Sequence, residues 1–364
     1  MLYYQLSKIV EKMSYTVKSS EHQRSRASDT ETKALLYMMN CHYNSKEIYY
    51  FVIDFFNDLT GMDQWSSKMW DLQSKGSSTT SPKQIGRDLV TLYKNYCSQL
   101  IFDGFVLFLE KFPSTMLRDN KKSVFNLNNI NRDGINKIQK GLIEECKKKE
   151  YIHSDWIKKD KINDFLGRVL FVVSSRSKSE YIKKIVENHP NIIPSDEELD
   201  AIFNELRDIQ SAKKNTRSIE GIQINSQDQC LEFGRHLTAG EIKLLVLGRI
   251  INKNPFEKGI PNSFLYILNN HPWERQKSLI EECRIALSRA LFNVNLSDNF
   301  WKLFSDIYEI ITKAEEAVDI DFVFLNLDIN VKKGCPDFDT LSLKFFIASV
   351  MEEVGNDNKK SCNR

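Results

Sequence analysis

The chain has 364 residues and lacks the clustered cysteines and histidines of a zinc site. Its seven cysteines are odd in number, are spread along the chain and include no C-x-x-C pair, and none of its six histidines falls in an H-E-x-x-H spacing. Scattered cysteines are typical of buried thiols in a reducing compartment, not of a disulfide framework. We therefore expect a cytoplasmic protein with structural cysteines.

Glycine-rich phosphate loops and long apolar runs are also missing. The 14 glycines form neither a P-loop nor a G-x-G-x-x-G motif, which argues against nucleotide hydrolysis by this chain. The sequence contains no run of eighteen apolar residues, and its start, M-L-Y-Y-Q-L-S-K-I-V-E-K, is unlike a signal peptide. We expect neither secretion nor a membrane partner.

What is present is an ordinary globular composition with an uneven charge. Hydrophobic residues make up 41% and charged residues 27%, which indicates a folded, soluble protein. The net charge of +2 hides an asymmetry, because residues 1–180 hold 28 Lys and Arg against 21 Asp and Glu, and the remainder holds 23 against 28. The basic first half favours a polyanion such as nucleic acid.

The pattern along the chain predicts three parts. Residues 1–28 are polar and read as a flexible arm, residues 29–185 as an α/β (α+β) domain with a mixed central sheet flanked by helices, and residues 186–364 as a mainly helical domain. The C-terminal part has helix starts near residues 195 and 238, a helix at 301–317 and strand-like pieces at 322–327.

Within the α/β part, the expected order is helix, hairpin, helix, buried strand, helix, buried strand. A capping box at residues 28–31 begins the first helix, and a second start at 44–47 is followed by apolar residues 48, 51, 52 and 55 at helical spacing. Strands near F-F-N-D-L-T and over K-M-W-D-L-Q-S-K would pair as a hairpin. A helix from 82, a strand at 104–109, a helix at 133–149 and a strand at 168–173 follow.

Alternation along the second hairpin strand places Asp71, Gln73 and Lys75 on one face. If Asp58 lies on the adjoining strand, its carboxylate can meet the side-chain oxygen of Gln73 at a shared divalent cation. Oxygen ligands of this kind suit Mg²⁺ or Mn²⁺. The Lys75 ammonium would orient a water acidified by the metal, and would stabilise the charge that grows on a phosphodiester.

These residues resemble a known family. An Asp followed after ten to twenty residues by (D/E/Q)-x-K on the next strand is the signature of the PD-(D/E)xK, or restriction-endonuclease-like, nucleases. Asp58, Gln73 and Lys75 match it in order, and the similarity covers roughly residues 29–112, and up to 175 by element order. More narrowly, N-D-L-T-G with W-D-L-Q-S-K-G and the helix I-G-R-D-L-V-T-L-Y is similar to nuclease domains of bacterial anti-phage defence effectors.

The chain departs from the family pattern at two positions. Asn57 stands where a proline usually precedes the first aspartate, and Gln73 replaces the usual acid, which leaves one negative charge fewer for the metal. Further candidate ligands are Glu31, Glu47 and Asp71. Asp54 rivals Asp58, but we expect it to lie in a helix.

Basic residues outside the motif have two interpretations. Lys83 and Arg87, on the helix after the motif, are candidates for contacts with nucleic acid. Lys213 and Lys214 with Arg217 read as surface charge.

The resemblance implies a Mg²⁺-dependent endonuclease that cuts DNA, regulated as an anti-phage effector by a partner such as a sensor or a helicase-like ATPase, with a homo-oligomer also compatible. The alternative is a catalytically inactive member of the fold that serves as a nucleic-acid-binding or assembly subunit. A third hypothesis is a helical adaptor, in which the side chains of Asp58, Gln73 and Lys75 would diverge.

Overall fold

The structure is a computed structural model that describes residues 15–17, 28–76, 81–186, 194–250, 259–314 and 318–361. The chain divides into two compact units. We call them the sheet unit, which runs to Tyr181 and resumes at Phe203–Thr238, and the helical unit, which comprises Ile182–Ile202 and the chain from Ala239 onward.

The sheet unit is built on a mixed seven-stranded sheet in the order β6-β7-β5-β4-β3-β2-β9. Strands β4, β5 and β7 are parallel, and the others pair antiparallel. The strands of this sheet are β2 (Ile48–Ile53), β3 (Leu59–Asp63), β4 (Met69–Lys75), β5 (Gly104–Leu109), β6 (Val124–Phe125), β7 (Val169–Val173) and β9 (His236–Thr238). A separate pair joins β1 (Tyr15–Thr16) to β8 (Gln223–Ile224).

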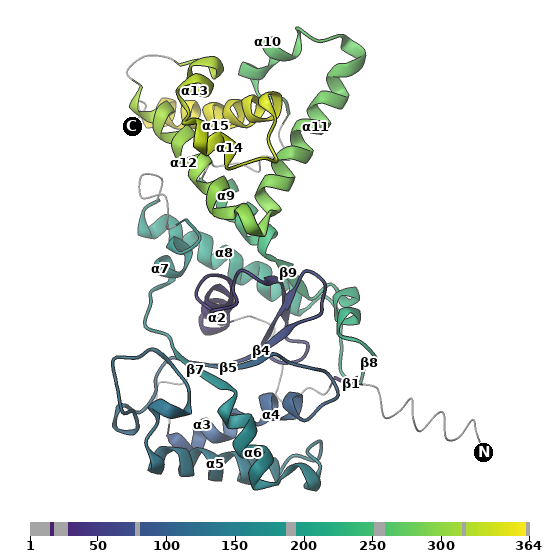
Figure 1. The fold of residues 1–364 in the computed structure, drawn as a ribbon, viewed down its shortest axis with the longest axis vertical. Helices are drawn as coiled ribbons and strands as arrows, with labels where there is room; N and C mark the ends of the chain where they lie inside the picture. The colour runs from purple at the N-terminus through teal and green to yellow at the C-terminus, as the bar shows by residue number, and fades with distance from the viewer. Residues whose placement is uncertain are drawn as a thin grey trace, which may run out of the picture. The chain divides into compact units, whose positions relative to one another are not determined.

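Helices cover both faces of the seven-stranded sheet, as Figure 1 shows. One face carries the connections between the parallel strands, which are α3 (Pro82–Asp88), α4 (Val90–Tyr96), α5 (Arg132–Cys146) and α6 (Lys159–Gly167). The opposite face carries α2 (Asp29–Asn40) and the part of α8 (Asp196–Lys214) that belongs to the sheet unit. The expected mixed α/β fold is therefore confirmed.

Two glycines bring α3 and α5 into close contact. A Cβ atom on Gly86 would lie 2.0 Å from the carbonyl oxygen of Ile138, and one on Gly141 would lie 2.0 Å from the carbonyl oxygen of Lys83. Only residues without a side chain allow backbones to approach this closely. The contact fixes α3, and with it the start of α4, over the sheet.

Several sequence predictions are confirmed by their local chemistry. The Ser28 hydroxyl accepts a hydrogen bond from the backbone N–H of Glu31 at the start of α2, and Ser81 accepts one from Gln84 at the start of α3. The buried strands β5 and β7 lie where continuous apolar runs predict them, and β3 and β4 form the expected hairpin. The helix predicted from residue 82 is divided at Leu89 into α3 and α4.

The helix predicted after residues 44–47 is wrong, because residues 48–53 form β2. Strand β2 lies between β3 and β9, and most of its residues are buried. A strand that is buried in this way has apolar residues without strict alternation, and in β2 their positions also match the spacing of a helix. The strand expected near F-F-N-D-L-T begins later, at Leu59. Residues 54–58 therefore form a connection between β2 and β3.

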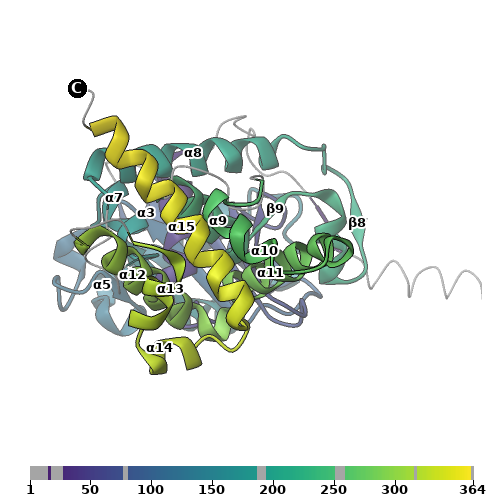
Figure 2. The same cartoon turned by 90° about the horizontal axis from the view of Figure 1, so that it is seen from above.

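The helical unit packs around α15 (Thr340–Ser361), which contacts α11, α12 and α13; Figure 2 shows α15 running across these helices. Its other helices are α9 (Ala239–Ile250), α10 (Leu265–Leu268), α11 (Trp273–Phe292), α12 (Ser297–Lys313), α13 (Ile320–Asn326) and α14 (Ile329–Lys333). The strand-like pieces expected at 322–327 are wrong, because the Asp319 side chain caps a helix there by accepting from Phe322. Among the helices that the structure describes, none has the length and apolarity to span a bilayer.

The sequence predicts a boundary between residues 185 and 186, and the division between the two units differs from that prediction. Helix α7 (Lys178–Lys183) and α8 both cross the division, and residues 203–238 group with the sheet because they supply β8 and β9. Most of the arm predicted at residues 1–28 lies outside the described residues, and Tyr15–Thr16 within it form β1.

Candidate active site

The side chains of Asp58 and Gln73 meet, as the sequence predicts. Asp58 directly precedes β3, and Gln73 lies opposite it on β4, since the neighbouring Leu59 pairs with Leu72. Gln73 Nε2 donates to Asp58 Oδ2 at 2.7 Å, and the backbone N–H and hydroxyl of Ser74 each donate to the same oxygen at 2.8 Å. Three donors therefore fix the Asp58 carboxylate beside β4.

This contact lies near the carboxyl end of β4, where the parallel strands β4, β5 and β7 end together. Lys75 is the last residue of β4, is half-buried, and follows Gln73 by two positions, on the same face of the strand. Open α/β sheets place their ligand sites outside the carboxyl ends of parallel strands. The three motif residues therefore gather at a position suited to a ligand.

The amide of Gln73 has the opposite orientation to the one expected. Its nitrogen faces Asp58, and its oxygen accepts a 2.7 Å hydrogen bond from the Thr91 hydroxyl on α4. The reason is electrostatic, because an amide N–H attracts a carboxylate whereas an amide oxygen repels it. Because a hydroxyl can either donate or accept, Thr91 can bond to Gln73 in both orientations of the amide.

Glu31, a further candidate ligand, lies beside Asp58. It is in the first turn of α2, on the face of the sheet opposite α4. Burial raises the pKa of the Glu31 carboxyl, Lys214 lowers it, and the charges of Asp58 and Asp54 raise it again. The mutual influence places the three carboxylates in one electrostatic neighbourhood at this end of the sheet.

Lys214 was missed as a member of this neighbourhood, and its interpretation as surface charge is wrong. The side chain is buried, with Nζ 3.5 Å from Glu31 Oε2 and 3.7 Å from Asp54 Oδ2. Helix α8 packs beside α2, where the Thr32 hydroxyl donates to Gln210 Oε1 at 2.9 Å. The signal was the helical period, since Lys214 continues the buried stripe of Phe203, Leu206 and Gln210.

Arg235, just before β9, holds the same region together. It is a large, fully buried side chain whose Nη1 donates to the Asp54 carbonyl at 2.7 Å and whose Nη2 donates to the Lys214 carbonyl. Asp54 has a φ of 50°, in the left-handed region that side chains other than glycine rarely adopt. The prediction that Asp54 lies in a helix is therefore wrong. Strained backbone of this kind persists where surrounding contacts impose it.

Asp71, another candidate ligand, does not join the site. Its carboxylate is fully buried and accepts from Thr60 at 2.9 Å, from Asn95 at 2.6 Å and from Asn57 at 3.5 Å. Burial raises the pKa of Asp71 to about 6, against the opposing effect of these donors. A carboxylate enclosed in this way serves the packing of α4 on β4.

Glu47 lies at the other end of the hairpin. It precedes Ile48, which pairs with Asp63 at the turn, and its carboxylate is 2.5 Å from Lys68 Nζ. Asp58 and Asp63 lie five residues apart, so this end is about 16 Å from Asp58 at the usual rise of a strand. Glu47 is therefore too remote to share a ligand with Asp58.

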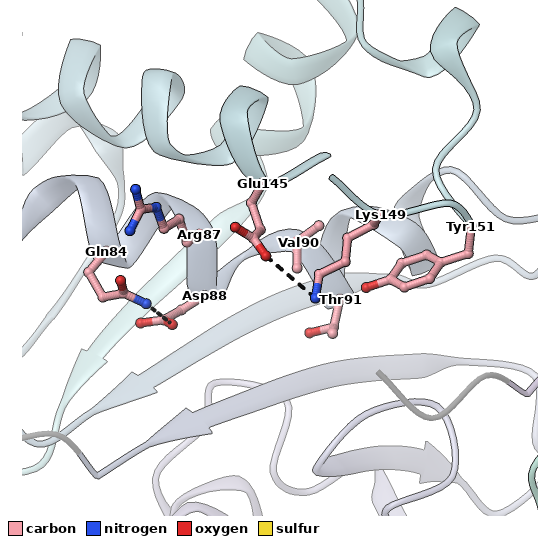
Figure 3. Close-up of a pocket in the computed structure, with 8 residues that line it drawn as sticks. All are labelled: Gln84, Arg87, Asp88, Val90, Thr91, Glu145, Lys149 and Tyr151. Atoms are coloured by element: carbon pink, nitrogen blue, oxygen red, sulfur yellow. Dashed lines mark hydrogen bonds and ion pairs between the residues drawn. The ribbon is translucent and has the colours of Figure 1, made fainter. Parts of the chain in front are cut away.

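The candidate DNA contacts Lys83 and Arg87 both pair with Glu144 on α5, at 2.7 Å and 3.5 Å. Arg87 also lines a pocket of about 270 Å³ between α3, α4 and the end of α5, which Figure 3 shows with Thr91 and Lys149. Because Thr91 also holds Gln73, this pocket adjoins the candidate site from the α4 side. The role of Lys83 and Arg87 stays a prediction.

The donor set fits a magnesium-type ion when the Gln73 amide is turned. Among the described residues, no group of three or more His, Cys, Asp and Glu side chains is arranged to hold a metal. Asp58 and Gln73 would supply two oxygen ligands, and Mg²⁺ in proteins commonly takes one or two side-chain ligands and keeps several waters.

Comparison with known proteins adds no relative, since no family model, curated protein or solved structure matches the chain.

Proposed function

We propose that the protein is a metal-dependent endonuclease that hydrolyses phosphodiester bonds of DNA. The observation that carries the proposal is the contact between Asp58 and Gln73 near the carboxyl end of β4, with Lys75 two residues farther along the same face. A site of oxygen ligands next to a lysine is suited to phosphodiester hydrolysis, because a cation held there would activate water and the ammonium would stabilise phosphoryl charge.

Each residue has a defined task in this proposal. A divalent cation, when bound, supplies a water of lowered pKa and neutralises phosphate charge. Asp58 holds the cation through a carboxylate that Ser74 fixes in place. Gln73 adds its amide oxygen after turning, while Thr91 keeps the amide anchored. The Lys75 ammonium stabilises negative charge that develops on the phosphoryl oxygens.

Binding to DNA would rest on charge and not on base sequence. The first half of the chain carries the excess of Lys and Arg, and contacts of such residues to phosphates are independent of sequence. A nuclease without sequence preference would damage the genome of its own cell. We therefore also propose control by a partner protein in anti-phage defence, with the helical unit as the region that receives the partner.

The test is incubation of purified protein with supercoiled plasmid and Mg²⁺ or Mn²⁺. Cleavage should disappear with EDTA and fall by roughly 1,000-fold in Asp58→Ala and in Lys75→Ala, since each removes a group that acts on the reacting phosphate. Glu47→Ala is the matched control, because it removes an exposed carboxylate at the far end of the hairpin. Cleavage that persists in Asp58→Ala and Lys75→Ala would contradict the proposal.

A specific observation favours the alternative of an inactive nuclease fold. The Gln73 oxygen faces Thr91 instead of Asp58, so ligand binding requires the amide to turn. If the amide never turns, the chain would bind nucleic acid without cleaving it. Mn²⁺ binding separates the two functions, because only the nuclease loses bound metal upon Asp58→Ala.

A further inference from the structure

The ammonium group of Lys214 lies between carboxylates that come from two different parts of the sheet unit. Glu31 is in the first turn of α2, and Asp54 is in the connection between β2 and β3. Lys214 Nζ is 3.5 Å from one carboxylate and 3.7 Å from the other, and its side chain is 8% exposed. A buried ammonium persists only when nearby negative charge compensates the loss of water.

The charges around Asp58 are consistent with a single additional cation. The charges of Asp58 and Asp54 both act on Glu31, and the Lys214 ammonium opposes them by lowering the pKa of Glu31. Glu31 and Asp54 therefore already have a cationic partner, whereas Gln73 and Ser74, which donate to Asp58, are neutral. The Lys214 ammonium and the Arg235 guanidinium, which also interacts with the charge of Asp54, would repel a second divalent cation from this partly buried region.

The position of Lys214 is fixed from several sides. It is the last residue of α8, and its carbonyl accepts from the buried Arg235 guanidinium, which also bonds to the Asp54 carbonyl. One turn earlier in α8, Gln210 accepts from Thr32 of α2. The lysine therefore reaches the carboxylates from a rigid support and not from a loop.

We infer that Lys214 is a positioning residue that takes the place of a second cation, so that the site receives one divalent ion, held by Asp58 and Gln73. The inference rests on the proposed function, because it presupposes a metal at Asp58. It also gives a role to Arg235 and to the part of α8 from Phe203 onward, which lie far along the chain from the Asp58 motif and belong to the sheet unit. The ammonium is the cationic partner of Glu31 and Asp54 at the distances given above.

Calorimetric titration of the full chain with Mn²⁺ tests the inference without relying on activity. The unaltered protein should bind one ion. Lys214→Met, which keeps the length of the side chain but removes its charge, should bind a second ion or bind the first roughly tenfold more tightly, because a repelling charge is gone. Lys214→Arg should restore binding of one ion with the original affinity, and Lys213→Met, on the same helix, should leave binding unchanged.

The outcomes separate this inference from the proposed function. If the unaltered chain binds no Mn²⁺, the proposed function fails. If the unaltered chain binds two ions, or if Lys214→Met binds the same number with the same affinity, the inference on Lys214 is overturned and the proposed function stands. Circular dichroism establishes that each variant is folded, and Lys214→Gln, whose amide can bond to both carboxylates, replaces Lys214→Met if that variant does not fold. The ion count of the unaltered chain decides without any variant.

Discussion

Two polar networks lie next to each other between β4 and α4, and they differ in their access to solvent. The inner network joins Asp71 of β4 to side chains around it, namely Asn57, Thr60 and Asn95. The outer network is centred on Gln73, two residues farther along the same face of β4, and consists of Gln73, Asp58, Ser74 and Thr91.

The inner network is sealed, whereas the outer network reaches a pocket and the partly exposed Asp58. Every side chain of the inner network is buried, and its carboxylate accepts from three neutral donors. In the outer network, Thr91 lines the pocket of Figure 3, and Asp58 stands at the start of β3. The same kinds of residue therefore serve stability within the core and, by our proposal, chemistry at its edge.

The largest effect is expected when the inner network is broken at Asn95. This side chain donates to Asp71 and to the Phe56 carbonyl, and it accepts from the Tyr15 hydroxyl. Asn95→Ala removes all three bonds and leaves a buried carboxylate short of a donor, so we expect the free energy of unfolding to fall by about 3 to 4 kcal/mol. Urea unfolding followed by circular dichroism measures the change.

A matched control is Gln84→Ala, which removes an amide that bonds to Asp88 at the surface of α3. The free energy of unfolding should then change by about 0.5 kcal/mol or less. An equal loss of stability in both variants would show that the inner network has no special role in the fold.

The second effect is a pH dependence that belongs to the inner network alone. Burial raises the pKa of Asp71 to about 6 from its ordinary value of 3.8, so the folded protein holds a proton that the unfolded chain has released between these values. The free energy of unfolding therefore falls as pH rises from about 4 to about 6, by about 3 kcal/mol from this group.

Asp71→Asn isolates that contribution, because it removes the titrating group. The Thr60 hydroxyl can accept from the new amide nitrogen, while the amide oxygen still accepts from Asn95. Relative to the unaltered protein, this variant should gain about 3 kcal/mol in free energy of unfolding between pH 4 and pH 7. Parallel stability curves for the two proteins over that range would disprove the assignment to Asp71.

The sequence predicts these networks only in part, and the reason is geometric. Alternation along β4 correctly places Asp71, Gln73 and Lys75 on one face. Alternation alone does not predict which of these three side chains is buried. Asn95 and Thr91 lie about one turn apart on α4, and this distance is close to that between Asp71 and Gln73, which are two residues apart on β4. That match becomes visible only when α4 is laid on β4.

Contacts between segments distant in sequence account for the other failures. The run I-Y-Y-F-V-I has apolar residues at helical spacing, and it forms a strand because β3 and β9 pair with it on both sides. β9 comes from the part of the chain that sequence reading assigned to another domain. The interpretation of Lys214 as surface charge was wrong for the same reason. A charged residue on a buried stripe needs partners that are distant in sequence, and for Lys214 these are Glu31 and Asp54.

The smallest effect is expected in the outer network at Thr91. Thr91→Val keeps the shape of the side chain and removes the hydroxyl that donates to Gln73 Oε1. Because this change removes one hydrogen bond where Asn95→Ala removes three, the free energy of unfolding should fall by only about 1 kcal/mol. By our proposal the amide then turns more easily toward Asp58, so Mn²⁺ affinity should be retained, whereas in Asn95→Ala the loss is one of stability. A loss of stability in Thr91→Val as large as that in Asn95→Ala would mean that the outer network is sealed as well, and the contrast between the two networks would no longer hold.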